Sequence, residues 1–440
     1  MRSYEGHISL MLVWLSRGLT ALVVLVALGA GSCGGDRPRT PRVLVVGIDG
    51  ATFRVAGPLL ASGKLPNLAG IAAEGVSGPL RSALPLASPR IWNTISTGKI
   101  PEKHGIISFA HPGKDGAPQL YLSSDRKTHA LWNIVSDAGL TVGVVNWWNT
   151  YPPARINGVI VSDHLIPAEV EARMRLARAK KLPRASVVFP ESWRDRIAHI
   201  MRIDAPLTTV PNPFRSDAGF PRWVRRSLER LEKRFSEDGL TIRIALEIED
   251  RIQPDLLMVF LPGIDRISHF LWGCLEPPDL YPARLRPTVA EREAGANAIR
   301  AYYEYTDALI GLLLERYDRQ DLVLVVSDHG FEAGVELMSL TGVHESENAI
   351  DGVLFARGAN IGPPGPAGSV TIHDITPTVL AWLGLPVAED MDGRPADFLV
   401  NVSVKRISTY DTEPIARVSS DASGAEERLI EQLRGLGYLE

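Results

Sequence analysis

The chain has 440 residues, with 47 Lys and Arg against 51 Asp and Glu and a formal net charge of −4. Its 45% hydrophobic and 22% charged residues are close to the globular average, which excludes a disordered chain, a collagen-like repeat and a disulfide-rich scaffold. The balanced charge argues against a nucleic-acid partner, and two cysteines, Cys33 and Cys274, are too few for a disulfide framework.

The first predicted element is a targeting segment. An apolar run over 19–30 follows Arg17, and it is too short to span a bilayer comfortably but typical of an export signal. The small residues leading to Cys33 resemble a bacterial lipoprotein signal, in which the cysteine is lipidated; ordinary cleavage and an uncleaved anchor are the alternatives. We predict a signal segment over 1–33, a linker over 34–41, and an exported protein, periplasmic or on the cell surface, anchored to a membrane at its N-terminus.

Short apolar runs then alternate with helical patterns. Uninterrupted runs predict strands covered on both faces at 43–48, 256–261 and 322–327, with further candidates at 141–145 and 158–162. Helical patterns occupy 66–75, 129–138, 291–317 and 375–383. This alternation predicts an α/β fold with a mostly parallel central sheet sandwiched by helices.

Residues 167–250 differ from the rest, because their helical stretches are basic and amphipathic. We interpret them as a helical cap inserted into a catalytic core formed by 42–166 and 251–400, followed by a C-terminal tail over 401–440. The charges of the cap are expected to form a solvated surface, since no aromatic residues are interleaved to stack on nucleic-acid bases.

Acidic residues and histidines gather where the predicted strands end. Asp49 follows the first strand, and Asp328 with His329 follows the strand at 322–327. Asp265 and His269 are four residues apart, which places both on one face of a helix. Ligands of such sheets bind beyond the carboxyl ends of the strands, so these side chains are candidates for one site.

Two further candidates are a serine and a histidine. Ser88 precedes Pro89, a good first-turn residue, so Ser88 is expected at the N-cap of a helix, where free N–H groups favour anions. His344 follows in the motif TGVHESEN. His373 competes with His344 as a ligand, although we expect His373 to cap the helix that follows it.

The ordered set of motifs resembles the alkaline phosphatase superfamily, and within it the type I phosphodiesterase/nucleotide pyrophosphatase family. The motifs are IDG, SPRIWNTISTGKIPEKHGI, D-x-x-x-H, SDHG and a later histidine. The resemblance runs from about Val43 to Arg394 and covers the middle insertion poorly. It implies an alkaline phosphatase-like fold and a metal-dependent hydrolase of small phosphate esters, a phosphodiesterase or pyrophosphatase.

The resemblance also implies two divalent metal ions. One set of implied ligands is Asp265, His269 and His344. The other set is Asp49, Asp328, His329 and the oxygen of Ser88. Three imidazoles without a thiolate favour Zn²⁺, with Mn²⁺ and Fe²⁺ open. Ser88 would be the nucleophile that forms a phosphoseryl intermediate, between metals that stabilise the attacking and leaving oxygens.

The chain departs from the family pattern near this serine. The family commonly has threonine as nucleophile and an asparagine three residues later, where this chain has Ile91. Substrate contacts are therefore expected from Arg90 or Asn93, and Trp148 is a candidate for lining the leaving-group pocket. A phosphomonoesterase or a phospho-headgroup transferase is the alternative activity. A sulfatase is less favoured, because the sulfatase pattern C/S-x-P-x-R fails at Pro89 and Arg90.

Overall fold

The computed structural model describes residues 41–113, 118–165, 187–203, 205–214, 219–225, 228–334 and 341–417. The predicted signal segment and the linker before Pro41 lie outside the described residues, as do 166–186 of the predicted core and cap and 418–440 of the tail. Every described helix is too short or too polar to span a bilayer.

A ten-stranded sheet forms the centre of the described chain, in the order β13-β2-β12-β9-β1-β8-β5-β6-β7, with β14 also paired to β2. Its middle strands are parallel: β9 (Leu322–Val326), β1 (Val43–Ile48), β8 (Leu256–Leu261), β5 (Val142–Val145) and β6 (Gly158–Val161). Val43 pairs with both Leu256 and Leu322, so β1, β8 and β9 end at the same level. The predicted apolar runs are thus confirmed as the interior of a parallel sheet.

The strands at either side of this block were not predicted. β12 (Asp351–Arg357) runs antiparallel to β9 and to β2 (Val76–Arg81), and β7 (Val188–Phe189) runs antiparallel to β6. The short strands β13 (Gly365–Pro366) and β14 (Val370–Thr371) pair with β2. Glycine and proline inside VSGPLR weaken the strand pattern of β2, as is usual away from the centre of a sheet.

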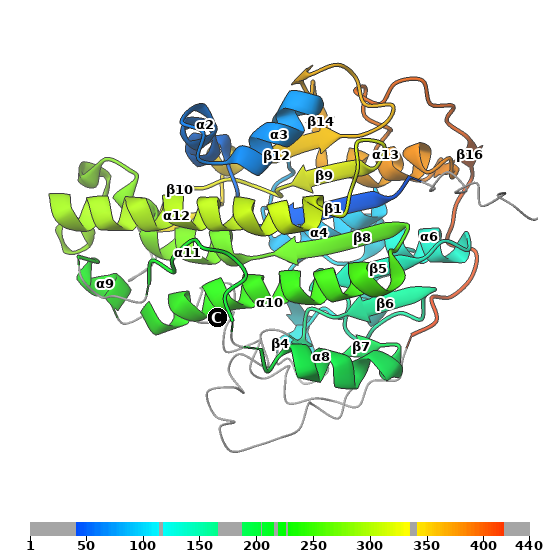
Figure 1. Cartoon of the computed structure of the whole chain (residues 1–440), viewed down its shortest axis with the longest axis horizontal. Helices are drawn as coiled ribbons and strands as arrows, with labels where there is room; N and C mark the ends of the chain where they lie inside the picture. Colours follow the sequence, from blue (N-terminus) through cyan, green and yellow to red (C-terminus); the bar gives the residue numbers. More distant parts are fainter. Residues whose placement is uncertain are drawn as a thin grey trace, which may run out of the picture. The chain divides into compact units, whose positions relative to one another are not determined.

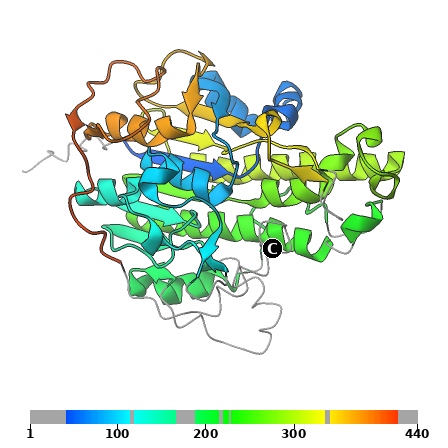
Figure 2. The ribbon, with the colours of Figure 1, turned by 180° about the vertical axis from the view of Figure 1, so that it is seen from behind.

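Helices cover both faces of the sheet, because alternate residues of each strand point to opposite sides. Leu44 and Val46 pack into one core, and Val43 and Val45 into the other. The helices in front of the sheet in Figure 1 are α2 (Phe53–Ala61), α3 (Pro66–Glu74), α10 (Leu228–Ile252), α11 (Gly263–Leu271) and α12 (Val289–Leu314). Those nearer the viewer in Figure 2 are α4 (Ser88–Thr97), α6 (Leu131–Asp137) and α13 (Ile375–Trp382). The predicted α/β sandwich is confirmed.

The segment interpreted as a cap divides into two parts. Its last helix, α10, packs on β5 and β8 through buried residues that include Ile244 and Ile248. α10 is therefore a layer of the sandwich, since an apolar stripe runs through its charged sequence. The described part before α10 contributes β7 to the sheet, and α8 (Arg194–Ile200) and α9 (Arg222–Arg225) add the buried residues Ile197, Ile200 and Val224 to the same core.

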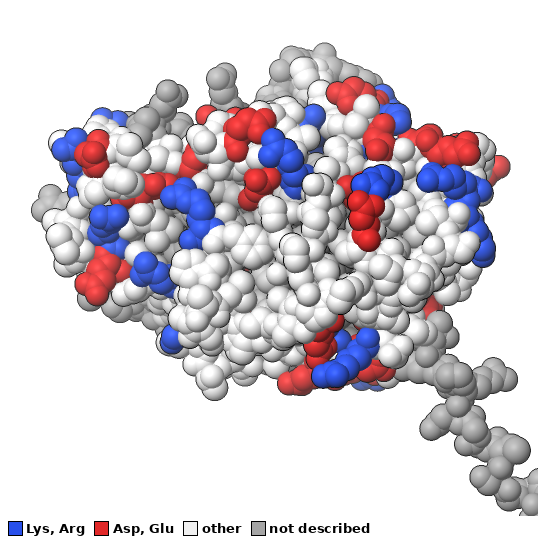
Figure 3. All heavy atoms as spheres, turned by 90° about the horizontal axis from the view of Figure 1, so that it is seen from above, with Lys and Arg blue, Asp and Glu red and all other residues white. Residues whose placement is uncertain are grey.

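The remaining elements are short and lie in the connections. They are α5 (Pro101–His104), β3 (Ala110–Pro112), β4 (Pro118–Leu120), β10 (Glu332–Ala333), β11 (Gly342–Val343), β15 (Val387–Ala388) and β16 (Arg406–Ile407). On the face seen in Figure 3, positive and negative side chains are interspersed and leave broad uncharged areas between them.

Candidate active site

The first site residue, Asp49, comes directly after β1 and depends on the glycine that follows it. Gly50 has a φ of +71°, and a Cβ built on it would lie 2.6 Å from the ring of Phe331 and 3.0 Å from the backbone of Asp265. Its N–H donates to Oδ1 of Asp328 at 3.2 Å. Glycine is therefore required in the IDG motif, because the turn brings the ends of β1, β8 and β9 into close approach.

The second pair, Asp265 and His269, lies on α11, directly after β8. Nε2 of His269 is 3.3 Å from Oδ1 of Asp265, and its Nδ1–H donates to the carbonyl of Gly342 at 2.9 Å. Nε2 of His344, which follows β11, is 3.6 Å from the same Asp265 oxygen. These three buried residues form one group with metal-binding geometry, which is the first set that the resemblance implied.

His329 connects this group to the end of β1. Its Nε2 lies 3.4 Å from Oδ1 of Asp49 and 3.3 Å from Oδ2 of Asp328, and its Nδ1–H donates to the carbonyl of Gly330 at 3.0 Å. Its ring stacks on that of His344 with centroids 3.8 Å apart. The aspartates and histidines of the two implied ligand sets are therefore adjacent halves of one buried cluster.

The geometry assigns Asp265 a larger role than the sequence did. The ligand atoms of Asp49, Asp265 and His329 all lie within 4.8 Å of one another, so Asp265 belongs to both groups. Asp328 lies beside His329 and fixes Gly50 through its other oxygen. The sequence had placed Asp328 in the second set and Asp265 in the first set alone.

Burial and like charges govern the ionisation of the cluster. Burial raises the pKa of Asp49 well above its usual value, and the carboxylates of Asp328 and Asp265 raise it further. Burial also raises the pKa of Asp328, although His329 opposes it. Burial works against ionisation of Asp265 too, but His269 and His344 outweigh it and lower its pKa. In the metal-free cluster, burial therefore opposes ionisation of all three carboxylates, and the histidines overcome this only at Asp265.

Buried polar atoms without hydrogen-bond partners indicate whether divalent ions fit this cluster. Among the described residues, Oδ1 of Asp49, Oδ2 of Asp328 and Nε2 of His329 are buried and have no hydrogen-bond partner. Such atoms are costly inside a protein unless an ion or another group satisfies them. Imidazole nitrogens and carboxylate oxygens suit Zn²⁺ and its first-row neighbours, so the donor set fits.

Ser88 is the first residue of α4 and is 2% exposed. Ala87 occupies the N-cap, so the helix begins one residue earlier than predicted from the sequence. The imidazole of His344 forms a hydrogen bond with the backbone of Leu86, which raises the pKa of His344. Burial and the nearby His329 outweigh this bond and lower the pKa well below its usual range. The loop that carries Ser88 therefore touches the histidine cluster.

Arg90 and Asn93 bind the chain around Ser88. The guanidinium of Arg90 donates to the carbonyls of Ala83 at 2.9 Å and Pro85 at 3.1 Å. Asn93 is fully buried, and its amide donates to Oδ1 of Asn149 at 2.6 Å. Both side chains hold the start of α4 in place, and substrate contact by them stays a prediction.

Trp148 is half-buried among aromatic rings. Its centroid lies 5.7 Å from that of Phe109 and 6.2 Å from that of Phe260, and both pairs meet edge to face. Ala87, the N-cap of α4, packs into the same small cluster as Phe109 and Trp148. Trp148 therefore shares this apolar cluster with the residue before Ser88, and its role in the leaving-group pocket stays a prediction.

The motifs did not predict what supports α11. Oδ2 of Asp238, on α10, accepts a hydrogen bond at 3.0 Å from the hydroxyl of Tyr302, on α12. A Cβ on Gly263, the first residue of α11, would collide with both of these groups. The helix that carries Asp265 thus docks on α10 and α12 at a glycine. Nothing in the sequence marks this glycine, because the collision involves residues 25 and 39 positions away.

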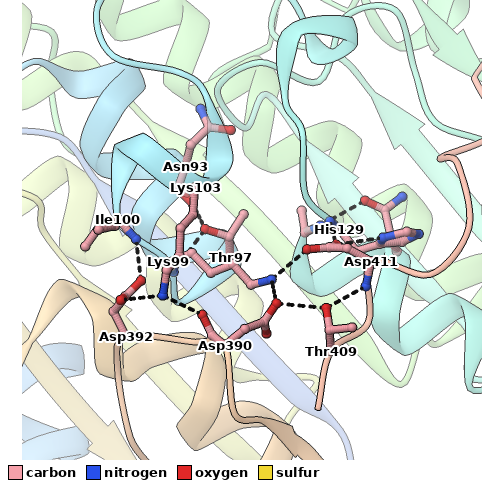
Figure 4. A network of polar contacts seen from close by, with 12 residues as sticks. Asn93, Thr97, Lys99, Ile100, Lys103, His129, Asp390, Asp392, Thr409 and Asp411 are labelled. Carbon is pink, nitrogen blue, oxygen red and sulfur yellow. Dashed lines mark hydrogen bonds and ion pairs between the residues drawn. The ribbon is translucent and has the colours of Figure 1, made fainter. Parts of the chain in front are cut away.

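The far end of α4 is held by a charged network (Figure 4). Nζ of the buried Lys99 donates to Asp390 and to Asp411, each at 2.6 Å. Nδ1 of His129 lies 3.0 Å from Oδ1 of Asp411, and Thr409 donates to Asp390 at 2.8 Å. The segment after β16 is thereby fixed to the helix that begins at Ser88.

Comparison with solved structures supports the fold. The chain is similar to a 2-O GAG sulfatase, with a TM-score of 0.52 and 14% sequence identity. The match covers 81% of this chain and 73% of the sulfatase. It is also similar to a provisionally assigned sulfatase from Bacteroides thetaiotaomicron, with a TM-score of 0.50, 14% identity and coverages of 84% and 76%. At these identities the likeness extends to the fold alone.

A third solved structure, phosphonoacetate hydrolase from Sinorhizobium meliloti in complex with phosphonoformate, matches with a TM-score of 0.43 and 16% identity. That match covers 67% of this chain and 57% of the other. A search of curated proteins gave no match. The sequence model of the family described as type I phosphodiesterase / nucleotide pyrophosphatase matches residues 43–397. Since this match spans most of the chain, the protein belongs to the type I phosphodiesterase/nucleotide pyrophosphatase family and is a phosphoric ester hydrolase with an alkaline phosphatase-like fold.

Proposed function

We propose that the protein hydrolyses small phosphodiesters, with Ser88 as the nucleophile. The reaction would use two divalent metal ions, and Zn²⁺ is the metal that the donor atoms favour. One observation carries this proposal: three buried carboxylates and three imidazoles from distant parts of the chain converge beyond the ends of β1, β8 and β9. These residues are Asp49, Asp265, His269, Asp328, His329 and His344. Such a cluster is expensive to bury unless cations neutralise it.

Each half of the cluster would hold one ion. Asp265, His269 and His344 would bind the first, and Asp49 and His329, with Asp328 beside them, the second. Bound divalent ions would lower the pKa of the serine hydroxyl and neutralise charge on the phosphoryl oxygens. The carbonyls of Gly342 and Gly330 hold His269 and His329 through Nδ1, which leaves Nε2 facing the carboxylates of Asp265 and Asp49 and able to bind an ion there.

The chain itself performs the phosphoryl transfer. The hydroxyl of Ser88 gives up its proton to solvent and its oxygen bonds to phosphorus as the bond to the leaving group breaks; the leaving oxygen takes up a proton from solvent and departs as an alcohol, and a phosphoseryl intermediate remains. N–H groups at the start of α4 would donate to the equatorial oxygens, as at other anion sites on helix N-termini; Pro89 has no N–H, and that of Ile91 already donates to the carbonyl of Ala87 at 3.1 Å. Water then hydrolyses the intermediate and restores Ser88. Arg90 and Asn93 keep the start of α4 in place during both steps.

Substrates are expected to be small phosphate esters or nucleotides, as in the family, with diesters preferred to monoesters. The Cys33 motif supports a lipid anchor on an exported protein. A sulfatase is not favoured, because the structural neighbours share only the fold and the chain lacks the sulfatase pattern at Pro89 and Arg90.

The test is a substrate panel on protein whose metal content is measured: a nitrophenyl diester, the monoester, the sulfate ester and a nucleotide. We expect the diester to be cleaved fastest, and Ser88→Ala to lose at least about 1000-fold in kcat while it retains its metal. Ser88→Thr, which keeps a hydroxyl, should retain part of the activity. Full turnover by Ser88→Ala would exclude the covalent mechanism. Faster hydrolysis of the monoester would indicate a phosphomonoesterase, and faster hydrolysis of the sulfate ester would indicate a sulfatase.

A further inference from the structure

A glutamate links the two loops that carry His329 and His344. Glu332 lies on β10, three residues after His329, and pairs across the β10–β11 ladder with Val343, the residue before His344. The preceding residue, Phe331, packs against the rings of His269 and His344 with centroids 5.1 and 5.4 Å away. β10 therefore passes directly beside the histidine cluster without supplying a ligand to it.

The carboxylate of Glu332 accepts four hydrogen bonds from the chain that leaves His344. Oε1 accepts the backbone N–H of Glu345 at 3.1 Å and that of Ser346 at 2.8 Å. Oε2 accepts the hydroxyl of Ser346 at 2.6 Å and the amide of Asn348 at 3.3 Å. Partial burial opposes ionisation, but these bonds outweigh it and lower the pKa of Glu332.

These bonds restrict the path of the backbone on both sides of His344. On one side, β11 pairs with β10; on the other, two consecutive amides are held by a single ionised group. Metal affinity depends on small displacements of a ligand, so a residue that fixes the backbone of a ligand affects binding without touching the ion.

We propose that Glu332 is a positioning residue for His344, and this inference rests on the proposed role of His344 as a metal ligand. Glu332 acts through residues 345–348 and contacts neither substrate nor metal. No motif marks it, because a glutamate in a loop has no distinctive spacing.

The test compares Zn²⁺ binding by metal-free wild type, Glu332→Ala, Glu332→Gln and Ser346→Ala, in competition with a chelator of known affinity. Glu347→Ala is the matched control, since Glu347 lies on the same loop and pairs with Arg81 at the surface, at 2.7 Å. We expect Glu332→Ala to weaken one of two sites by about 10- to 100-fold and leave the other unchanged. Glu332→Gln should weaken that site less, because its remaining oxygen still accepts the two backbone N–H groups, and Glu347→Ala should bind like wild type.

Thermal unfolding of the metal-free proteins separates positioning from general damage. The unfolding temperature of Glu332→Ala should stay close to that of wild type, because water can reach the amides of this partly exposed loop. Wild-type affinity in Glu332→Ala would overturn the inference. If Glu332→Ala fails to fold, wild-type affinity in Glu332→Gln would overturn it instead. A wild-type protein that binds no Zn²⁺ would overturn the proposed function, and this inference with it.

Discussion

The two ends of the central strands both bury charge, but they neutralise it differently. At the amino end, Arg42, just before β1, forms an ion pair with Glu249 on α10 at 2.5 Å. Its guanidinium also donates to the carbonyl of Arg316 at 2.6 Å, and its backbone N–H donates to Asp321 at 2.7 Å. The hydroxyl of Tyr317 donates to Glu249 as well. Each carboxylate here has a partner within the chain.

At the carboxyl end of the same strands, three buried carboxylates lie among histidines, and their ion pairs among the described residues are with these histidines rather than with arginine or lysine. Burial raises the pKa of Asp49 and of Asp328, and the nearby carboxylate of Asp265 raises both further. Oδ1 of Asp49 and Oδ2 of Asp328 are buried and accept no hydrogen bond among the described residues. The protein thus completes its charge balance itself where the role is structural, and leaves it incomplete where cations are proposed to bind.

The largest expected effect on metal binding comes from removing the charge of a carboxylate at the carboxyl end of the strands. Asp49→Asn should lower Zn²⁺ affinity by more than about 100-fold and reduce turnover with it, because a ligand is lost rather than a supporting group. The metal-free variant should be as stable as wild type or more stable, since burial and the carboxylates of Asp328 and Asp265 oppose the ionisation of Asp49. Binding titrations and thermal unfolding with and without chelator check both statements. A large loss of stability in the metal-free variant would contradict the comparison.

Removing the ion pair at the amino end of the strands should lower stability and leave metal binding unchanged. Arg42→Met leaves Glu249 buried without its cation and should lower the free energy of unfolding by about 3–5 kcal/mol. Metal content and kcat per folded molecule should not change, because the ion pair lies at the other end of the strands. Urea unfolding together with metal analysis measures this. Loss of metal from folded Arg42→Met would show that the two ends are coupled.

The charged network around Lys99 should make a smaller contribution to stability, and this contribution should depend on pH. Burial opposes ionisation of Asp411, but hydrogen bonds from His129 and Lys99 outweigh it and lower its pKa to about 2. The pKa of an unfolded Asp is about 3.9, so the carboxylate stabilises the fold above that pH and stops doing so as the pH falls through about 2.

Asp411→Asn should therefore be less stable than wild type at neutral pH, and the difference should shrink between about pH 4 and pH 2. The effect should be smaller than that of Arg42→Met, because Asp411 is only half-buried and solvent screens it. Unfolding temperatures measured across this range test the sign, and a difference that grows on acidification would contradict it.

The strands that carry the site were predictable, and those beside them were not. β1 and β8 match the predicted runs 43–48 and 256–261, because a strand buried on both faces is apolar throughout. β2 and β12 escaped prediction, because their pairing is antiparallel and glycine and proline interrupt β2. α10 was taken for part of a cap, since its charged residues concealed the apolar stripe that packs on the sheet.

For the site, the motifs identified residues that converge in the fold, but not the groups that orient them. The carbonyls of Gly342 and Gly330 are backbone atoms and leave no mark on the sequence. Gly263 and Glu332 are common residues whose importance comes from contacts made after folding.

The sequence by itself determined the family and the α/β class, and it supplied the candidate site residues, because apolar runs and motifs can be recognised in the sequence without the fold. Only the tertiary structure decided that Asp265 faces both halves of the cluster and that Asn93 is enclosed by its neighbours. Those properties depend on distances between residues far apart in the chain, and packing sets such distances through the summed contacts of many side chains.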